Sequence, residues 1–294
     1  MIMYNNTDGS TGYNCSSKGN QLKFCVGDKW YKADFLGYEA ASEYLVSRLL
    51  ERSNVHMFVP YSLHEITYNG RAFNGCVSDD FLKPGQQLIT AERLYKSYYG
   101  HPVEDDLRNM SLDKKILNFV NAMEDITGLS HFGEYLTTLM ELDAFTLNED
   151  RHFHNIAVVR NPDETYTYCP VFDNGAAFLS DTRSDYPLEK NTLGLIASVK
   201  AKPFCKDFDE QMERCEALYG VQLQLYLADL SDVLADIEKM YGTEISDRMQ
   251  TIYEHQKYMY QELFRPGPEM LAWEEECQDT EITQPEEEEE DYEL

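Results

Sequence analysis

The sequence predicts an α+β protein in which a β-rich N-terminal part is followed by a larger, helical C-terminal part. Up to about residue 82, short runs of β-branched and aromatic residues alternate with turn signals such as Gly27-Asp28 and Asn69-Gly70. From about residue 88, apolar residues instead recur at helical spacing. Strands and helices that are segregated along the chain are typical of α+β architecture. With 294 residues, of which 43% are hydrophobic, the chain can form one large domain or two modest lobes.

The N-terminal part, residues 21–85, predicts a small antiparallel sheet of about five strands with one helix. Strands are expected at residues 21–26 and 29–35, around a two-residue turn, and within residues 55–82. Residues 37–52 have an amphipathic pattern that predicts a helix. The turn-forming Lys83-Pro84-Gly85 marks the boundary with the helical part.

The C-terminal part, residues 86–265, is predicted to be mainly helical with one inserted β-hairpin. Helices are expected at residues 90–98, 104–108, 112–127, 131–147, 206–219, 222–240 and 244–264. The hairpin is expected from strands at residues 156–160 and 165–171 around Asn161-Pro162-Asp163. Residues 180–202 lack clear periodicity and form either a regulatory segment or a plain connecting loop. The acidic residues 266–294 cannot build a core and are expected to be disordered.

Charge and cysteine content narrow the class of protein. The formal net charge is −28, which argues against general binding to nucleic acids or anionic membranes. Residues 274–294 hold 12 acidic and no basic residues, which leaves −16 on the rest of the chain. The seven cysteines are scattered without a CxxC motif, as expected of reduced cytosolic thiols. No secretion signal and no membrane-spanning apolar run is evident, so a cytoplasmic location is expected.

Two acidic signatures flank the predicted hairpin. Asp150 is followed five residues later by Asn155, and Asp173 lies in the turn Phe172-Asp173-Asn174-Gly175, where Gly175 allows a tight turn. Phosphoryl transfer requires oxygen ligands for magnesium and a group beside the acceptor hydroxyl. One carboxylate and one amide can suffice as protein ligands, because Mg²⁺ keeps waters and phosphate oxygens. A hairpin that returns a second Asp to the first site would supply this arrangement.

These residues carry a resemblance to known kinases. The pattern D-R-H-x-x-N from Asp150 to Asn155 resembles the catalytic loop of phosphoinositide 3/4-kinases. The wider pattern, N-x-D-R-H followed by a hairpin and F-D-N-G, is similar to HipA-like atypical Ser/Thr protein kinases. The resemblance implies a bilobal protein-kinase-like fold with a small antiparallel β-rich N-lobe and a larger helical C-lobe. It also implies ATP and Mg²⁺ as cofactors and transfer of the γ-phosphate to a protein hydroxyl.

The resemblance assigns catalytic and metal-binding roles to four residues. Asp150 would orient or deprotonate the acceptor hydroxyl, and His152 would assist near the γ-phosphate. Asn155 and Asp173 would hold magnesium. His154 is expected to be structural.

A further set is expected to bind the nucleotide. Lys32 on a strand and Glu43 in the following helix would hold the phosphates, with Glu39 as the competitor for the acidic role. The polar residues 1–20 are either a flexible N-terminus or a phosphate-covering loop in which four residues offer backbone N–H groups: Gly9, Ser10, Thr11 and Gly12. Residues 77–81, including Val77 and Asp79, are expected to form a hinge whose backbone binds the adenine edge.

Three alternatives stay open at this stage. A pseudokinase would bind nucleotide without catalysis. The presence of Asp150, Asn155 and Asp173 disfavours this alternative. A His/Asp metallohydrolase would use His152 and His154 with the acidic residues as metal ligands. An interaction protein would recruit basic partners through its acidic tail. The kinase reading predicts a protein substrate and, since HipA is held by an antitoxin, a regulatory partner protein, while the toxin role itself is not carried over.

Overall fold

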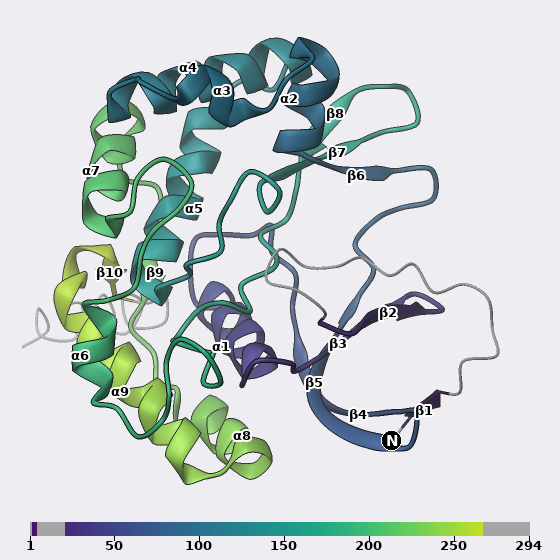
Figure 1. The fold of residues 1–294 in the computed structure, drawn as a ribbon, viewed down its shortest axis with the longest axis vertical. Coiled ribbons are helices and arrows are strands. Elements are labelled where there is room, and N and C mark those ends of the chain that lie inside the picture. Colours follow the sequence, from purple (N-terminus) through teal and green to yellow (C-terminus); the bar gives the residue numbers. More distant parts are fainter. Residues whose placement is uncertain (1, 5–20, 267–294) are drawn as a thin grey trace, which may run out of the picture.

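The predicted segregation of strands and helices is confirmed in the computed structural model, which describes residues 2–4 and 21–266. A small β-sheet region lies against a larger helical body (Figure 1). The sheet region contains β1 (Ile2–Tyr4), β2 (Lys23–Val26), β3 (Lys29–Ala33), α1 (Glu39–Leu50), β4 (Ser62–Tyr68) and β5 (Arg71–Asp79). The helical body contains β6 (Gln87–Thr90), α2 (Ala91–Tyr99), α3 (Val103–Leu107), α4 (Leu112–Thr127), α5 (Phe132–Thr146), the hairpin strands β7 (Ala157–Arg160) and β8 (Tyr166–Tyr168), α6 (Thr192–Ile196), α7 (Phe208–Tyr219), β9 (Leu225–Tyr226), α8 (Ser231–Tyr241), α9 (Thr243–Met259) and β10 (Phe264–Arg265).

The first sheet has the strand order β1-β4-β5-β3-β2. All neighbours are antiparallel except β1, which runs parallel to β4. The predicted number of five strands is correct, but one member is wrong. Residues 55–61 form no strand, and Phe58 makes only an isolated bridge to Val171. Pro60 removes a backbone donor from this segment, which disfavours a place inside a sheet.

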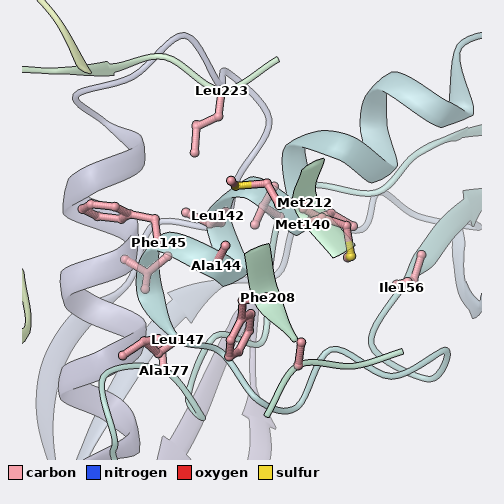
Figure 2. Close-up of a cluster of buried hydrophobic side chains, with 14 of the residues drawn as sticks. Met140, Leu142, Ala144, Phe145, Leu147, Ile156, Ala177, Phe208, Met212 and Leu223 are labelled. Atoms are coloured by element: carbon pink, nitrogen blue, oxygen red, sulfur yellow. The ribbon is translucent and has the colours of Figure 1, made fainter. Parts of the chain in front are cut away.

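The helical body is organised around α5. Twelve of its 15 residues are buried, among them the carboxylates of Glu141 and Asp143. Figure 2 shows Met140, Leu142 and Phe145 of this helix packed among side chains that include Phe208 and Met212 of α7. Among the described residues, no helix is both long and apolar enough to cross a membrane.

The helix predicted at residues 90–98 is α2, and Gln87–Thr90 before it forms strand β6, which pairs with β7. Two other predicted helices are clearly shorter in the structure. Residues 222–230 are mostly extended rather than helical, because the backbone N–H groups of Gln222 and Leu223 donate to the buried carboxylate of Glu141, 2.9 and 2.7 Å away. The last predicted helix ends at Met259. The hydrogen bonds from residues 222 and 223 to Glu141 are tertiary contacts, and such contacts cannot be predicted from the spacing of apolar residues.

A cluster of phenylalanines gives a stability prediction for this core. The ring of Phe119 on α4 lies 6.0 Å from that of Phe132, 4.9 Å from Phe153 and 5.6 Å from Phe204, and its side chain is fully buried. We expect Phe119→Ala to lower the free energy of unfolding by about 3–5 kcal/mol. Leu117→Ala on the exposed face of the same helix should change it by less than about 0.5 kcal/mol. Urea unfolding of both variants tests this, and equal losses would contradict it.

Candidate active site

A cleft of about 750 Å³ lies between the sheet and the β7–β8 hairpin. One part of its wall is apolar and is formed by Trp30, Val59, Phe81, Leu82, Leu88 and Phe172. Polar side chains line the rest, namely Lys23, Lys32, His152, His154, Asn155 and Asp173 among others. An adjoining pocket shares Lys23, Asn155 and Asp173 and adds Asp150. The structure therefore brings both predicted acidic signatures to one site.

Lys32 is the centre of a buried charge cluster. Its ammonium forms a short ion pair with Glu43 and lies 3.0 Å from Asp173 Oδ1 and 3.0 Å from the Tyr61 hydroxyl. Burial alone would lower the pKa of Lys32, but the carboxylates of Asp173 and Glu43 outweigh it and raise that pKa well above its ordinary value. The lysine is therefore a fixed positive charge at this end of the cleft.

The two glutamates of α1 have separate positions. Glu43 is buried, and its Oε2 also accepts a hydrogen bond of 2.8 Å from the backbone N–H of Asn174. Glu39 instead accepts hydrogen bonds from the backbone N–H groups of Leu36 and Gly37, at 2.6 and 3.0 Å. It thereby binds the loop that leads into α1. The structure thus pairs Lys32 with Glu43 and not with Glu39.

A second lysine that the sequence reasoning missed reaches the same carboxylate. Lys23 on β2 lies opposite Lys32 in the β2–β3 ladder, and its Nζ is 3.0 Å from Asp173 Oδ1. Cross-strand partners in a hairpin share a face, so the two-residue turn at Gly27-Asp28 was the signal that could have found it. Lys23 and Lys32 outweigh the effect of burial and hold the pKa of Asp173 well below its ordinary value.

The turn that presents Asp173 differs from the expected one. The left-handed backbone conformation is at Asp173 itself, with φ of 58°, and not at Gly175. A Cβ atom at Gly175 would lie 3.4 Å from Cβ of Glu39 and 3.7 Å from Cγ of Glu43. Gly175 therefore allows the turn to lie close to α1. A non-glycine residue held at positive φ is strained and is frequently found at functional sites.

Arg151 connects the two acidic signatures. It was not singled out in the sequence analysis. It is fully buried, and its guanidinium binds both carboxylate oxygens of Asp143 on α5, at 2.9 and 3.2 Å from Nε. It also donates to Asn174 Oδ1 at 2.6 Å and to the backbone carbonyls of Asn155 and Phe172, both at 3.1 Å. One planar cation thus fixes the loop 150–155 relative to the turn 172–175.

Asp150 and its loop neighbours form the opposite side of the site. The Asn155 side-chain nitrogen donates a hydrogen bond of 2.8 Å to the backbone carbonyl of Asp150. The amide oxygen of Asn155 is therefore the atom that can bind a metal ion. His152 Nε2 lies 3.8 Å from Asp150 Oδ1, and neither buried ring nitrogen of His152 has a hydrogen-bond partner among the described residues. Burial lowers the pKa of His152. Lys202, from the segment without periodicity, reaches Asp150 Oδ1 at 3.1 Å.

The remaining predicted residues lie elsewhere. Val77 sits in the middle of β5 with its backbone between β3 and β4, so it is not available to a ligand. Asp79 ends the same strand and binds Lys29 at 2.5 Å on the exposed surface. Neither residue lines the cleft, where Ser78 and Asp80 lie instead, and nucleotide binding by the backbone of residues 77–81 stays a prediction. Gly9, Ser10, Thr11 and Gly12 lie outside the described residues.

The donor set of the site fits a hard cation. Asp173 supplies a carboxylate, and the hydrogen bonds that it accepts from described residues all reach Oδ1. Asn155 supplies an amide oxygen, and both residues line the same pocket. Oxygen donors of this kind suit Mg²⁺. The rings of His152 and His154 lie 5.4 Å apart and nearly perpendicular, and the described residues contain no group of three or more His, Cys, Asp or Glu side chains placed to hold a metal ion.

The start of α1 is anchored to α8 through Asp34. Its Oδ1 accepts from the backbone N–H of Ala40 at 2.7 Å, and its Oδ2 accepts from the Tyr241 hydroxyl at 2.7 Å. Burial and the nearby Glu39 raise the pKa of Asp34 to about 8 despite these hydrogen bonds. The helix that carries Glu43 is therefore tied to the helical body through a titratable group.

This raised pKa predicts a pH dependence of stability. Between pH 4 and 8 the unfolded chain has released the Asp34 proton while the folded chain still binds it, so the free energy of unfolding should fall as the pH rises. We expect Asp34→Asn to show a smaller fall over this range than the wild type. Urea unfolding at pH 5, 6.5 and 8 measures both slopes. An unchanged slope in the variant would contradict the prediction.

The Arg151–Asp143 pair gives a second stability prediction. Asp143→Ala leaves a fully buried guanidinium without its carboxylate, and we expect a loss of about 3–5 kcal/mol in the free energy of unfolding. Asp105→Ala is the matched control, because Asp105 pairs with Arg108 at 2.9 Å on the exposed surface and such pairs contribute less than about 1 kcal/mol. Chemical unfolding followed by circular dichroism compares the two, and a similar small loss in both would refute the role assigned to the buried pair.

A comparison with solved structures agrees with this architecture. No protein-family model and no curated protein matches the sequence. Among solved structures, the Helicobacter pylori proinflammatory kinase CtkA is similar over 87% of this chain and 93% of that chain, with a TM-score of 0.60 and 15% identity. HipA of Shewanella oneidensis, solved with HipB and operator DNA, matches 87% of this chain and 62% of that chain, with a TM-score of 0.38 and 12% identity. The likeness to CtkA shows that the chain has a kinase-like fold, with a small antiparallel sheet region joined to a helical body.

Proposed function

We propose that the protein is an ATP- and magnesium-dependent phosphotransferase of the HipA-like Ser/Thr type, which transfers the γ-phosphate of ATP to a protein hydroxyl. The observation that carries this proposal is the convergence of Asp150, Asn155 and Asp173 on one pocket, beside the Lys32–Glu43 pair. These residues come from β3, α1 and both ends of the hairpin. Their meeting requires the whole fold, which is the property expected of an active site.

The cleft suits a nucleotide because its two parts differ in chemistry. The apolar part, lined by Val59, Phe81 and Leu88 among others, can enclose a planar base. The part that contains Lys23 and Lys32 offers two ammonium groups to a polyphosphate. The fold of CtkA, which is described as a kinase, supports the same assignment.

Each polar residue has a role in this proposal. Asn155 and Asp173 would hold magnesium, which when bound neutralises charge on the phosphates. Asp150 accepts the proton of the acceptor hydroxyl while the hydroxyl oxygen forms a bond to the γ-phosphorus. The bond from that phosphorus to the β-phosphate bridging oxygen breaks, and ADP leaves with the electron pair. His152, whose pKa is lowered by burial, lies 3.8 Å from Asp150 Oδ1 and would assist near the γ-phosphate.

The proposed acceptor is a protein and not a lipid. Anionic lipid headgroups are bound by clusters of basic residues, whereas the chain without its residues 274–294 still carries a net charge of −16. The same acidity disfavours nucleic acids and membrane surfaces as partners. A regulatory partner protein and a cytoplasmic location are part of the proposal through the HipA-like pattern of residues 148–175.

Transfer of label from γ-labelled ATP with magnesium to a generic protein acceptor tests the proposal. We expect Asp150→Ala and Asp173→Asn each to reduce transfer at least about 100-fold, because each removes a group that acts on the reacting atoms. Asp163→Asn is the matched control, since Asp163 is exposed at the tip of the hairpin. It should transfer at the wild-type rate.

Thermal stabilisation by MgATP separates an inactive kinase fold from a wrong assignment. Stabilisation of the wild type that is lost in Asp173→Asn, without label transfer to any acceptor, would identify a nucleotide-binding pseudokinase. The absence of both stabilisation and transfer in the wild type would refute the proposal.

A further inference from the structure

The segment that carries Lys202 is built into the helical body next to Asp150. Gln211 of α7 is buried, and its side chain holds the segment on both sides of Pro203. The amide nitrogen donates to the Lys202 carbonyl at 2.9 Å, and the amide oxygen accepts from the Phe204 N–H at 2.9 Å. The Lys115 ammonium binds the Phe204 carbonyl at 3.0 Å. The backbone at Lys202 is therefore held by side chains of two helices.

The same segment packs directly on the loop that contains Asp150. The ring of Phe204 is buried and lies 5.6 Å from that of Phe153, which is three residues after Asp150. From this base the Lys202 side chain extends until its Nζ is 3.1 Å from Asp150 Oδ1. The Asp150 side chain is 10% exposed, whereas that of Lys202 is 45% exposed. Lys202 is thus the more exposed member of the ion pair, and it lies beside the pocket that Asp150 lines.

The 150–155 loop itself does not supply a mobile positive charge at this point. Arg151 is fully buried and its guanidinium is bound to Asp143. The pKa of His152 is lowered by burial, which disfavours the charged form of its ring. Lys23 and Lys32 are bound to Asp173 at the other signature. Among the described residues, the cation paired with Asp150 comes from outside the loop and is Lys202, which is placed to meet negative charge that develops there during transfer.

We propose that Lys202 is a catalytic residue that contacts the γ-phosphoryl group during its transfer beside Asp150. This inference rests on the proposed function and adds a residue to it. The lysine forms and breaks no covalent bond: its ammonium stays protonated and binds phosphoryl oxygens as the bond to the acceptor oxygen forms. Its ammonium contacts the γ-phosphate already in the nucleotide complex. Because Asp150 receives the acceptor proton during transfer, its ion pair with Lys202 weakens at that moment and the contact with the phosphoryl oxygens strengthens.

Nucleotide binding tests this role independently of turnover. Calorimetric titrations would compare MgADP with the magnesium complex of AMP-PNP, which retains a γ-phosphate. For Lys202→Ala we expect the affinity for AMP-PNP to fall about tenfold, the loss of one charge-assisted hydrogen bond, and the affinity for ADP to stay within about twofold of wild type. Transfer from ATP should fall about 100-fold. Lys202→Arg should recover a part of both.

Lys200→Ala is the matched control, because Lys200 is an exposed lysine two residues away that, unlike Lys202, forms no ion pair with Asp150. It should behave as the wild type. Equal discrimination between the two nucleotides in Lys202→Ala and wild type would overturn the role of Lys202 alone. Faster transfer by Lys202→Ala would also overturn it, because the lysine would then obstruct the acceptor. If the wild type bound neither nucleotide, the proposed function would fail and the role of Lys202 with it.

Discussion

The buried ammonium of Lys32 is the interaction on which the rest of the site depends. It binds Glu43 from α1 and Asp173 from the turn after the hairpin, so that a strand, a helix and a distant turn meet at one cation. Each of these charges would be costly to bury alone, and together they compensate one another. With Lys23 included, the cluster contains two ammonium groups and two carboxylates and is neutral. It therefore fixes the relative position of the sheet region and the helical body at the cleft.

Arg151 has the corresponding role on the other side of the site. Its guanidinium spans Asp143 on α5, Asn174 beside Asp173 and the backbone of Asn155. The most buried helix of the body thus positions both acidic signatures through one side chain. Preorganisation of this kind keeps donor and acceptor groups fixed before a substrate arrives. It also explains why a residue without direct access to the cleft occurs within the D-R-H-x-x-N pattern.

The parts of this fold that follow local rules could be predicted from the sequence, and the parts that follow tertiary contacts could not. Turn residues and the spacing of apolar residues predict the β2–β3 hairpin, α1 and the β7–β8 hairpin. The pairing of Lys32 with Glu43 followed from motif order, although the choice against Glu39 needed coordinates. By contrast, the loop at residues 222–230 depends on hydrogen bonds to Glu141, which no local pattern encodes.

Within the site, the two lysines that were missed share one property: their partners lie far away in the sequence. Lys202 reaches Asp150 across 52 positions, and Lys23 reaches Asp173 across 150. In the predicted hinge, residues 77–81, β5 continues to Asp79 and side chains alternate between its two faces. Ser78 and Asp80 therefore line the cleft, whereas Val77 and Asp79 do not.

The central claim is that the Lys32 cluster receives the phosphates of a nucleotide, and calorimetric titration of MgATP tests it most directly. Lys32→Met should bind at least about tenfold more weakly than the wild type, because a buried charge-assisted contact is lost. Lys29→Met on the same strand, whose side chain pairs with Asp79 on the outer surface, should bind as the wild type does. Binding that is equal in all three proteins, or absent in all three, would contradict the account.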